Sequence, residues 1–432
     1  MNRRSVLAGG LALPIACAAQ PEQGENELGL TADGKADDYP RLQRVVDRTA
    51  ERGGIVTLPA GTIRLSRPLR MRSGVSLVGA GRHYEVARLG NRFTGTWVSG
   101  APIELHSVQN CAIRDIGINC GERPDTIGIS IGSDNKPASK SHVIERVSIF
   151  GAALGVRWGL SNRLATLEQC DDITFRDIAF HSCVDGFRLD AANGSDFSRI
   201  ERVTFDALRS IGFDLRSAGF LTIENCAAGT LANATMFRIT GNSPDPLRIV
   251  GCQSEPLGRF LAAEGPNDQA TILLEGNVIN RPIEANGILR IVSRANYLNS
   301  TIALDGLVRW RSYDDVWDAP GARHVPQVRN GARFVASIFR DAGASFGRYL
   351  QAGTRIEEDT NVIEVVTRSG VYSPPFARGG TFAVGDYFEA GGQAYRVQTP
   401  GVAGLQLSDL RSGQIVVERI GNAAITRRIP LT

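Results

Sequence analysis

The chain has 432 residues, of which 42% are hydrophobic and 22% charged, so it can bury one large core or two and is not intrinsically disordered. Its 48 glycines follow no Gly-X-Y period, which excludes a collagen-like chain and favours a turn-rich, all-β protein over a helix bundle. The 48 Lys and Arg against 45 Asp and Glu give a net charge of +3, a balance that does not suggest a nucleic-acid-binding protein.

The first twenty residues are typical of an export signal. Arg3 and Arg4 precede an apolar run that is too short to span a bilayer, and small residues follow it. The arginine pair predicts a twin-arginine signal over residues 1–20, with an ordinary secretory signal as the alternative. We therefore expect a periplasmic or secreted protein without a later transmembrane segment. A lipid anchor on Cys17 is the minor alternative.

Six cysteines remain after Cys17, an even number that permits disulfides in an oxidising compartment. Cys226 and Cys252 occupy equivalent points of two successive repeats, so we expect them to stack as small core residues. The sequence has no Cys-x-x-Cys motif and no histidine cluster, and a zinc site is not predicted.

One amphipathic helix is predicted over about residues 38–52. Leu42, Val45, Val46 and Ala50 have helical spacing, a proline lies in the first turn, and Gly53-Gly54 follows the last turn. Short strands broken by glycine turns are predicted from there to residue 81.

A pair of short strands then recurs from residue 113 to about residue 305. The first strand of a repeat reads like Ile113-Arg-Asp-Ile-Gly-Ile, and the second like Leu154-Gly-Val-Arg-Trp. Equivalent residues of the second strands lie 19 to 31 positions apart: Ser130, Arg157, Arg188, Asp214, Arg238, Leu261, Glu284 and Ala303. Because no strand this short can bury its apolar face alone, the repeats are expected to stack as the turns of a parallel β-helix.

The N-terminal motifs resemble those of the pectate-lyase-like, right-handed parallel β-helix superfamily. They are Asp33-Gly34, Asp37-Asp38, Gly53-Gly54, Pro59–Thr62 and Ser73–Gly81. The resemblance implies an all-β fold, with a right-handed parallel β-helix over residues 28–309 whose open end is covered by the N-terminal helix. It also implies an exported carbohydrate-active enzyme. New strands after residue 310 predict a small C-terminal β domain over residues 310–432.

Charged residues of the middle repeats are expected on one outward face, because equivalent residues of parallel coils lie about 4.8 Å apart. Arginines on such a face can clamp uronate carboxylates with two hydrogen bonds each, although alternating charges can also simply satisfy the ladder. The candidate catalytic residues are Asp185, Arg188, Asp190, Asp214 and Arg216. The candidate substrate-binding residues are Arg157, His181, Asn193 and Arg238.

Two reactions are open at this face. In β-elimination, arginines neutralise a uronate carboxylate so that a base can remove the adjacent proton. In glycoside hydrolysis, two carboxylates flank the bond at about 5 Å or about 6.5–9.5 Å, which Asp190 or Asp185 could form with Asp214. Asp185 also matches the Asp of the Asn-Thr-Asp-Gly strand of polygalacturonases, but the following repeat lacks their Asp-Asp pair.

The leading interpretation is a polysaccharide lyase, with a glycoside hydrolase as the first alternative. A non-catalytic glycan-binding or tailspike-like β-helix is the second alternative. No cofactor or metal site is predicted; calcium bridging of substrate carboxylates is compatible with the reaction, but the sequence offers no ligand set for it. The expected partner is a polysaccharide, not a nucleic acid or a membrane, and a homotrimer is left open.

Overall fold

The structure is a computed structural model, and it describes most of residues 28–317 and several short strands beyond them. The described ranges are 28–82, 95–133, 138–160, 170–190, 195–216, 219–229, 233–241, 246–255, 258–313, 315–317, 327–328, 332–336, 340–341, 354–356, 363–366, 387–390, 393–397 and 417–421. The expected export signal lies outside these ranges.

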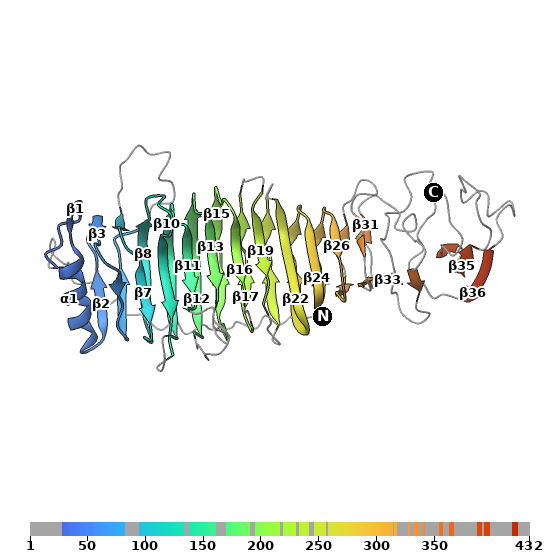
Figure 1. The fold of residues 1–432 in the computed structure, drawn as a ribbon, viewed down its shortest axis with the longest axis horizontal. Helices are drawn as coiled ribbons and strands as arrows, with labels where there is room; N and C mark the ends of the chain where they lie inside the picture. Colours follow the sequence, from blue (N-terminus) through green and yellow to red (C-terminus); the bar gives the residue numbers. More distant parts are fainter. Residues whose placement is uncertain are drawn as a thin grey trace, which may run out of the picture.

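The described residues form an elongated solenoid in which each coil pairs in parallel with the next (Figure 1). Three faces run along it. The first face contains β2 (Gly54–Thr57), β5 (Val75–Val78), β14 (Arg199–Glu201), β17 (Thr222–Glu224), β20 (Leu247–Val250), β27 (Arg309–Tyr313) and β30 (Arg333–Ala336). The second contains β1 (Asp33–Asp37), β3 (Gly61–Arg64), β6 (Thr96–Ser99), β15 (Thr204–Asp206), β18 (Ala227–Ala228), β21 (Gln253–Ser254), β23 (Val278–Ile279), β25 (Tyr297–Leu298), β28 (Val316–Trp317) and β31 (Arg340–Asp341).

Three long strands bend from the first face to the second: β8 (Ala112–Asn119), β10 (His142–Phe150) and β12 (Ile173–His181). The third face contains β4 (Leu69–Arg70), β7 (Ile103–His106), β9 (Ile127–Gly132), β11 (Leu154–Trp158), β13 (Asp185–Leu189), β16 (Ile211–Leu215), β19 (Thr235–Ile239), β26 (Ile302–Leu304) and β29 (Gln327–Val328). Each of β22 (Arg259–Glu275) and β24 (Ile283–Arg294) pairs with strands of both the third and the first face. The all-β, right-handed parallel β-helix expected from the sequence is therefore confirmed.

Parallel pairing continues past residue 309, where the sequence places a domain boundary. Trp310 pairs with Ile291 on one side and with Phe334 on the other, and its side chain is fully buried. The coil pattern is hard to see here because arginines and a tryptophan replace the aliphatic residues of earlier coils. Antiparallel pairs follow among the later described strands: β32 (Thr354–Ile356) with β33 (Ile363–Val366), and β35 (Gln393–Val397) with β34 (Tyr387–Ala390) and β36 (Val417–Gly421).

The helix α1 (Tyr39–Ala50) covers the N-terminal end of the solenoid, as expected (Figure 1). Leu42 and Val46 face the core and are fully buried. Asp38 precedes the helix, but its carboxylate accepts hydrogen bonds from the backbone N–H groups of Thr31 (2.7 Å) and Ala32 (3.1 Å). The buried Asp38 thus ties the segment before β1 to the helix.

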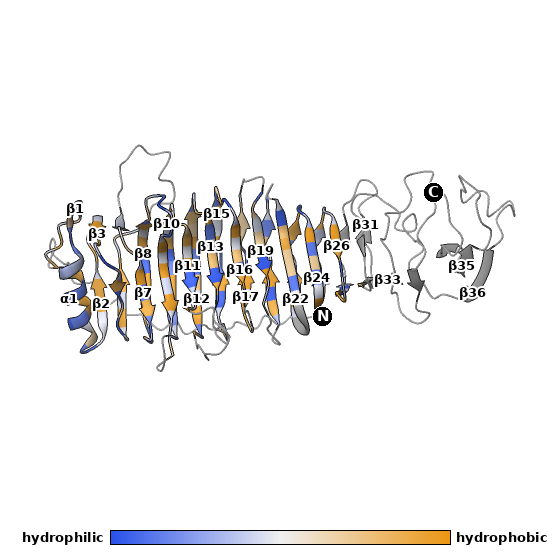
Figure 2. Cartoon of the chain, in the orientation of Figure 1, coloured by the Kyte–Doolittle hydropathy of each residue, from blue (hydrophilic) through white to orange (hydrophobic). Residues whose placement is uncertain are grey.

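Hydrophobic and hydrophilic residues alternate along the strands, and the apolar ones fill the interior (Figure 2). Phe187, Phe213 and Phe237 stack on successive coils with ring centroids 5.3 Å and 5.1 Å apart. The six cysteines beyond Cys17 are buried and free, and the expectation that Cys226 and Cys252 are small core residues is confirmed. The core therefore consists of ladders of identical or similar residues.

A buried histidine makes the solenoid sensitive to acid. His142 is 1% exposed; its Nδ1 accepts a hydrogen bond from the Cys111 N–H (3.3 Å), and its Nε2 lies 3.0 Å from Ser139 Oγ, which donates to the Leu105 carbonyl. This chain of hydrogen bonds requires the neutral ring, with Nε2 donating to Ser139. Burial lowers the pKa of His142 to about 4, against a smaller opposing effect of Asp172.

We expect this group to stabilise the fold above pH 6.5 and to lose that stabilisation as the pH falls from 6.5 towards 4, because only the unfolded state binds the proton in that window. The loss amounts to roughly 3 kcal/mol. Urea unfolding at pH 7 and pH 4 measures it, with His142→Asn as the comparison, since the asparagine oxygen can accept from the Cys111 N–H without titrating. Equal pH dependence in both proteins contradicts this assignment.

Candidate functional site

The third face brings the predicted charged ladder together. Arg157 on β11 pairs with Arg188 on β13, which pairs with Asp214 on β16, which pairs with Arg238 on β19. The next residue in register is Ala262, not the expected Leu261, which is fully buried beside Phe237. A shift of one residue moves a side chain to the opposite side of a strand, so the expected ladder position in this coil was wrong by one residue.

Asp214 is the centre of the ladder, and three arginines cover it. Arg238 donates to both carboxylate oxygens, at 2.8 Å and 2.6 Å, Arg216 Nε donates to Oδ2 at 3.0 Å, and Arg188 Nε lies 3.4 Å from Oδ2. The Asp214 side chain is 0% exposed. Burial opposes its ionisation, but the hydrogen bonds and charges of Arg238 and Arg216 outweigh burial and keep the pKa of Asp214 below its usual value.

The other two aspartates of the face are also covered by arginines. Asp185 accepts a hydrogen bond from Arg188 Nη2 at 3.0 Å, and the Asp190 carboxylate lies 3.1 Å from Arg216 Nη1. Their side chains are 11% and 5% exposed. Burial raises the pKa of Asp190, although the charges of Arg216 and Arg188 oppose this effect.

The arginines are the accessible groups of this face. The side chains of Arg188, Arg216 and Arg238 are 31%, 35% and 36% exposed. Arg157 hydrogen-bonds to two main-chain carbonyls, those of Gly159 (3.1 Å) and Leu160 (2.6 Å), rather than to a carboxylate. The face therefore presents guanidinium groups to solvent and keeps its carboxylates beneath them.

Two predicted residues are not joined to this cluster. His181 ends β12 on the second face, and its Nδ1 lies 3.5 Å from Oδ2 of Asp206, the last residue of β15. Asn193 lies outside the described residues. The cluster thus consists of four arginines and three aspartates: Arg157, Arg188, Arg216, Arg238, Asp185, Asp190 and Asp214.

The structure contains a second charged ladder, which the sequence analysis did not single out. At the bend between the first two faces, Arg146 donates two hydrogen bonds to Asp115 (2.6 and 2.7 Å), and Arg202 donates two to Asp177 (2.7 and 2.9 Å). These arginines also contact glutamates, since Arg146 Nη1 lies 2.8 Å from Glu145 Oε1 and Arg202 Nη1 lies 3.8 Å from Glu201 Oε2. The Glu201 side chain is 7% exposed and is also approached by Arg199 (2.6 Å) and Arg176 (3.0 Å), so arginines converge on a buried carboxylate on the first face as well as on the third.

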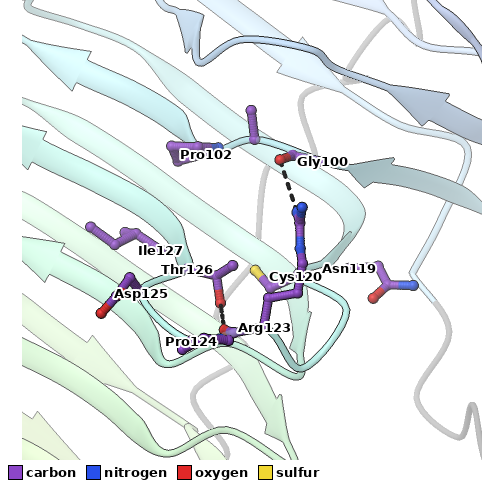
Figure 3. A pocket seen from close by; sticks show the side chains of 10 residues that line it. Gly100, Pro102, Asn119, Cys120, Arg123, Pro124, Asp125, Thr126 and Ile127 are labelled. Carbon is purple, nitrogen blue, oxygen red and sulfur yellow. Dashed lines mark hydrogen bonds between the residues drawn. The ribbon is translucent and has the colours of Figure 1, made fainter.

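A pocket of about 310 Å³ opens elsewhere, at the turn before β9 (Figure 3). Its lining residues are Gly100, Ala101, Pro102, Asn119, Cys120, Arg123, Pro124, Asp125, Thr126 and Ile127. The Arg123 side chain donates to the Gly100 carbonyl at 3.1 Å and the Thr126 hydroxyl donates to the Arg123 carbonyl at 2.8 Å, so its polar groups are largely engaged in shaping the turn. This pocket is not predicted from the sequence, because its lining residues come from two segments, 100–102 and 119–127, that are not neighbours in the chain.

The described residues contain no group of three or more His, Cys, Asp or Glu placed to hold a metal ion. They also contain no helix that is long and apolar enough to cross a membrane.

Comparisons with known proteins support the fold. Residues 26–114 match the family model described as rhamnogalacturonase A/epimerase, pectate lyase-like. The catalytic unit of a GH87 α-1,3-glucanase from Streptomyces thermodiastaticus is 14% identical, with a TM-score of 0.51, over 76% of this chain and 65% of that one. The A-module of the mannuronan C-5 epimerase AlgE4 from Azotobacter vinelandii is 17% identical, with a TM-score of 0.50, over 73% and 94%. No curated protein matches the sequence.

The solved structures support the parallel β-helix architecture, and the family match over residues 26–114 confirms the superfamily resemblance of the N-terminal motifs. The family match covers the cap and the first coils, whereas the arginine cluster begins at residue 157. The chemistry of the site therefore rests on its own geometry.

Removing the charge of Asp214 should destabilise the protein strongly. We expect Asp214→Asn to lower the free energy of unfolding by about 3–5 kcal/mol, because three guanidinium groups then lose the anion that holds them together. The matched control is Asp206→Asn: that side chain is 72% exposed, and its loss should cost less than about 0.5 kcal/mol. Urea unfolding of both variants measures the difference. Equal stability of the two variants would show that Asp214 is not the centre of the network.

Proposed function

We infer that the protein is an enzyme that binds a uronate-containing polysaccharide on the third face and cleaves it by β-elimination. The observation that carries this inference is that Arg188, Arg216 and Arg238 are about one-third exposed above carboxylates that are almost fully covered, with the half-buried Arg157 on the preceding coil. A polymer lying on this face meets a guanidinium group on each of four successive coils, and a uronate carboxylate is the sugar substituent that these groups bind best.

The arginines can promote the first chemical step. A guanidinium that neutralises the uronate carboxylate makes the hydrogen on the adjacent ring carbon more acidic, and it also stabilises the negative charge that develops when a base removes this proton. The electron pair then forms a carbon–carbon double bond and expels the glycosidic oxygen, which takes up a proton. Each cleavage yields one new reducing end and one unsaturated uronate. We assign to the arginines the neutralising role only, because a guanidinium bound to carboxylates is held in its charged form.

The same geometry is unfavourable for hydrolysis by paired aspartates. A hydrolase needs two carboxyl groups that reach the glycosidic bond or a water molecule next to it. Asp214 is 0% exposed and makes hydrogen bonds to two arginines, and the Asp190 side chain is 5% exposed. For this reason we place the lyase ahead of the hydrolase.

The decisive experiment is to incubate the protein with acidic and neutral polysaccharides, including polygalacturonate, rhamnogalacturonan, alginate and α-1,3-glucan. Reducing ends and the ultraviolet absorbance of unsaturated uronates are followed in the same tube. A rise of both signals in parallel supports the proposal. Reducing ends alone identify a hydrolase. Incorporation of solvent deuterium without new chain ends identifies an epimerase, the activity named for the Azotobacter vinelandii relative. Retention of a polymer without any of these changes identifies a binding protein.

Arg157 is the best arginine to test, because its hydrogen bonds go to main-chain carbonyls and the carboxylate network does not depend on it. We expect Arg157→Gln to lower kcat/KM by about 10- to 100-fold through the loss of one charged hydrogen-bonding contact, and Arg157→Lys to retain part of the activity. The matched control is Arg290→Gln, on an exposed position of the first face. Full activity of Arg157→Gln with unchanged stability places the substrate elsewhere.

Export through residues 1–20 is part of the same proposal. The pair Arg3-Arg4 can be tested by the double substitution Arg3→Lys and Arg4→Lys, since a twin-arginine signal depends on the guanidinium groups, whereas an ordinary secretory signal needs only positive charge. We expect the variant to accumulate inside the cell and the parent protein to be exported, as cell fractionation shows. Normal export of the variant points to the secretory alternative.

A further inference from the structure

Two phenylalanines project from the solenoid at the corner between the third and first faces. Phe197 is 81% exposed and Phe220 is 48% exposed. Their rings are parallel to within 1°, and their centroids lie 6.0 Å apart. They therefore form a small, ordered apolar surface on two successive coils, which we call the aromatic pair.

The backbone conformation at this corner is energetically unfavourable for a phenylalanine. The pairing of Thr174 with Arg199 and of Arg199 with Thr222 places Asp172, Phe197 and Phe220 at equivalent points of successive coils. All three have left-handed backbone angles, with φ of 54°, 58° and 46°. Gly, Asn and Asp adopt this conformation readily, whereas a bulky residue rarely does. At the same corner, earlier coils have Gly74 and Asn110, which follow this preference, and the small Ser141.

The aromatic pair interrupts this pattern on the two coils that carry the centre of the arginine cluster. Phe197 follows Asp190 in the coil of β13, and Phe220 follows Arg216 in the coil of β16. Four residue steps separate Arg216 from Phe220, so their Cα atoms are no more than about 15 Å apart. An oligosaccharide of a few rings can therefore contact both the arginines and the aromatic pair.

We propose that the aromatic pair is a second part of the glycan site, which holds a sugar ring of the bound polysaccharide by its apolar face. The axial C–H bonds of a pyranose form such a face and pack on the electron-rich surface of an aromatic ring. Asp196 precedes Phe197 in its turn and Asp172 lies at the equivalent point of the preceding coil, so this part of the site suits a sugar that offers hydroxyl groups rather than a carboxylate. The polymer bound here accordingly carries neutral sugars as well as uronates, a deduction that rests on the function proposed above.

A second copy of the chain fits this surface less well than a sugar does. A stable protein interface buries about 1,200–2,000 Å² in total, which two side chains between charged neighbours do not provide. A single sugar ring, by contrast, matches the size of the pair. Strained, exposed aromatic residues beside a candidate site are also the kind of feature that function, rather than folding, maintains.

The test is the double variant Phe197→Asn with Phe220→Asn, which installs the residue that the fold itself uses at Asn110. The control is Leu307→Asn, which removes another exposed apolar side chain, 55% exposed, far along the solenoid. Asparagine tolerates the left-handed conformation, so the double variant should unfold at the same or a higher urea concentration than the parent protein. Affinity electrophoresis in gels that contain rhamnogalacturonan, polygalacturonate or alginate then reports binding, and turnover of the same polymers reports KM and kcat.

We expect the double variant to bind rhamnogalacturonan about tenfold more weakly and to raise KM by a similar factor at unchanged kcat, while the control behaves like the parent protein. Unchanged binding and KM in the double variant overturn the proposal and leave the lyase function standing. A third outcome is that the parent protein binds a polymer without turning it over and that the double variant loses this binding. This result supports the aromatic pair and overturns the lyase function instead. The proposal is overturned if the parent protein binds none of the polymers. It is also overturned if the parent protein sediments as an oligomer and the double variant sediments as a monomer.

Discussion

The stacking of equivalent residues on successive coils is the constraint on which the rest of this structure depends. In a parallel coil each side chain lies about 4.8 Å from its equivalents above and below, so every position must be compatible with its own neighbours in the repeat. Inside, this requirement produces the phenylalanine ladder through Phe213 and the buried cysteines. On the outer surface, the same requirement means that charged side chains on successive coils must be placed so that the repulsion between like charges is offset.

Both charged ladders satisfy that requirement by placing arginines over carboxylates. At the bend between the first and second faces, Arg146 and Arg202 each donate two hydrogen bonds to an aspartate, and Arg176, Arg199 and Arg202 approach the buried Glu201 beside them. On the third face Asp214 is buried beneath several guanidinium groups, and Arg157 adds a further cation. Holding so many arginines together costs free energy, because like charges repel and the aspartate loses its hydration. The third face is our candidate for ligand binding because Arg157 adds a guanidinium group that hydrogen-bonds to main-chain carbonyls and not to a carboxylate.

The aromatic pair adds a second cost on the same coils. Phe197 and Phe220 have a backbone conformation that disfavours them and expose apolar surface that could have been polar, as it is at Asp172. Arginines for carboxylates and aromatic rings for apolar sugar faces are complementary ways to hold an acidic heteropolysaccharide. Arginines of the third face and the aromatic pair at its corner occur on the same two coils, so together they can contact a longer stretch of polysaccharide than either feature alone.

The sequence alone determined the coil and its outward ladder. The repeat spacing and the alternation of apolar residues were sufficient to predict the parallel β-helix, the cap helix, and the register from Arg157 to Arg238, because a short strand with one apolar side can be buried only by stacking. The same signal failed at Leu261 and at residue 310, where the residues of a coil depart from the pattern of its neighbours.

Only the tertiary structure decided which groups of the ladder are accessible. Asp214 and Arg238 are equivalent in the sequence pattern, yet one is covered and the other exposed, because long arginine side chains from neighbouring coils fold over the short carboxylate. The corner that aligns Phe197 with Phe220 was also hidden, since turns of different length separate the strands and only the pairing of Arg199 with Thr222 reveals the equivalence. Repeats specify what stacks, whereas side-chain reach and turn length specify what a ligand can touch.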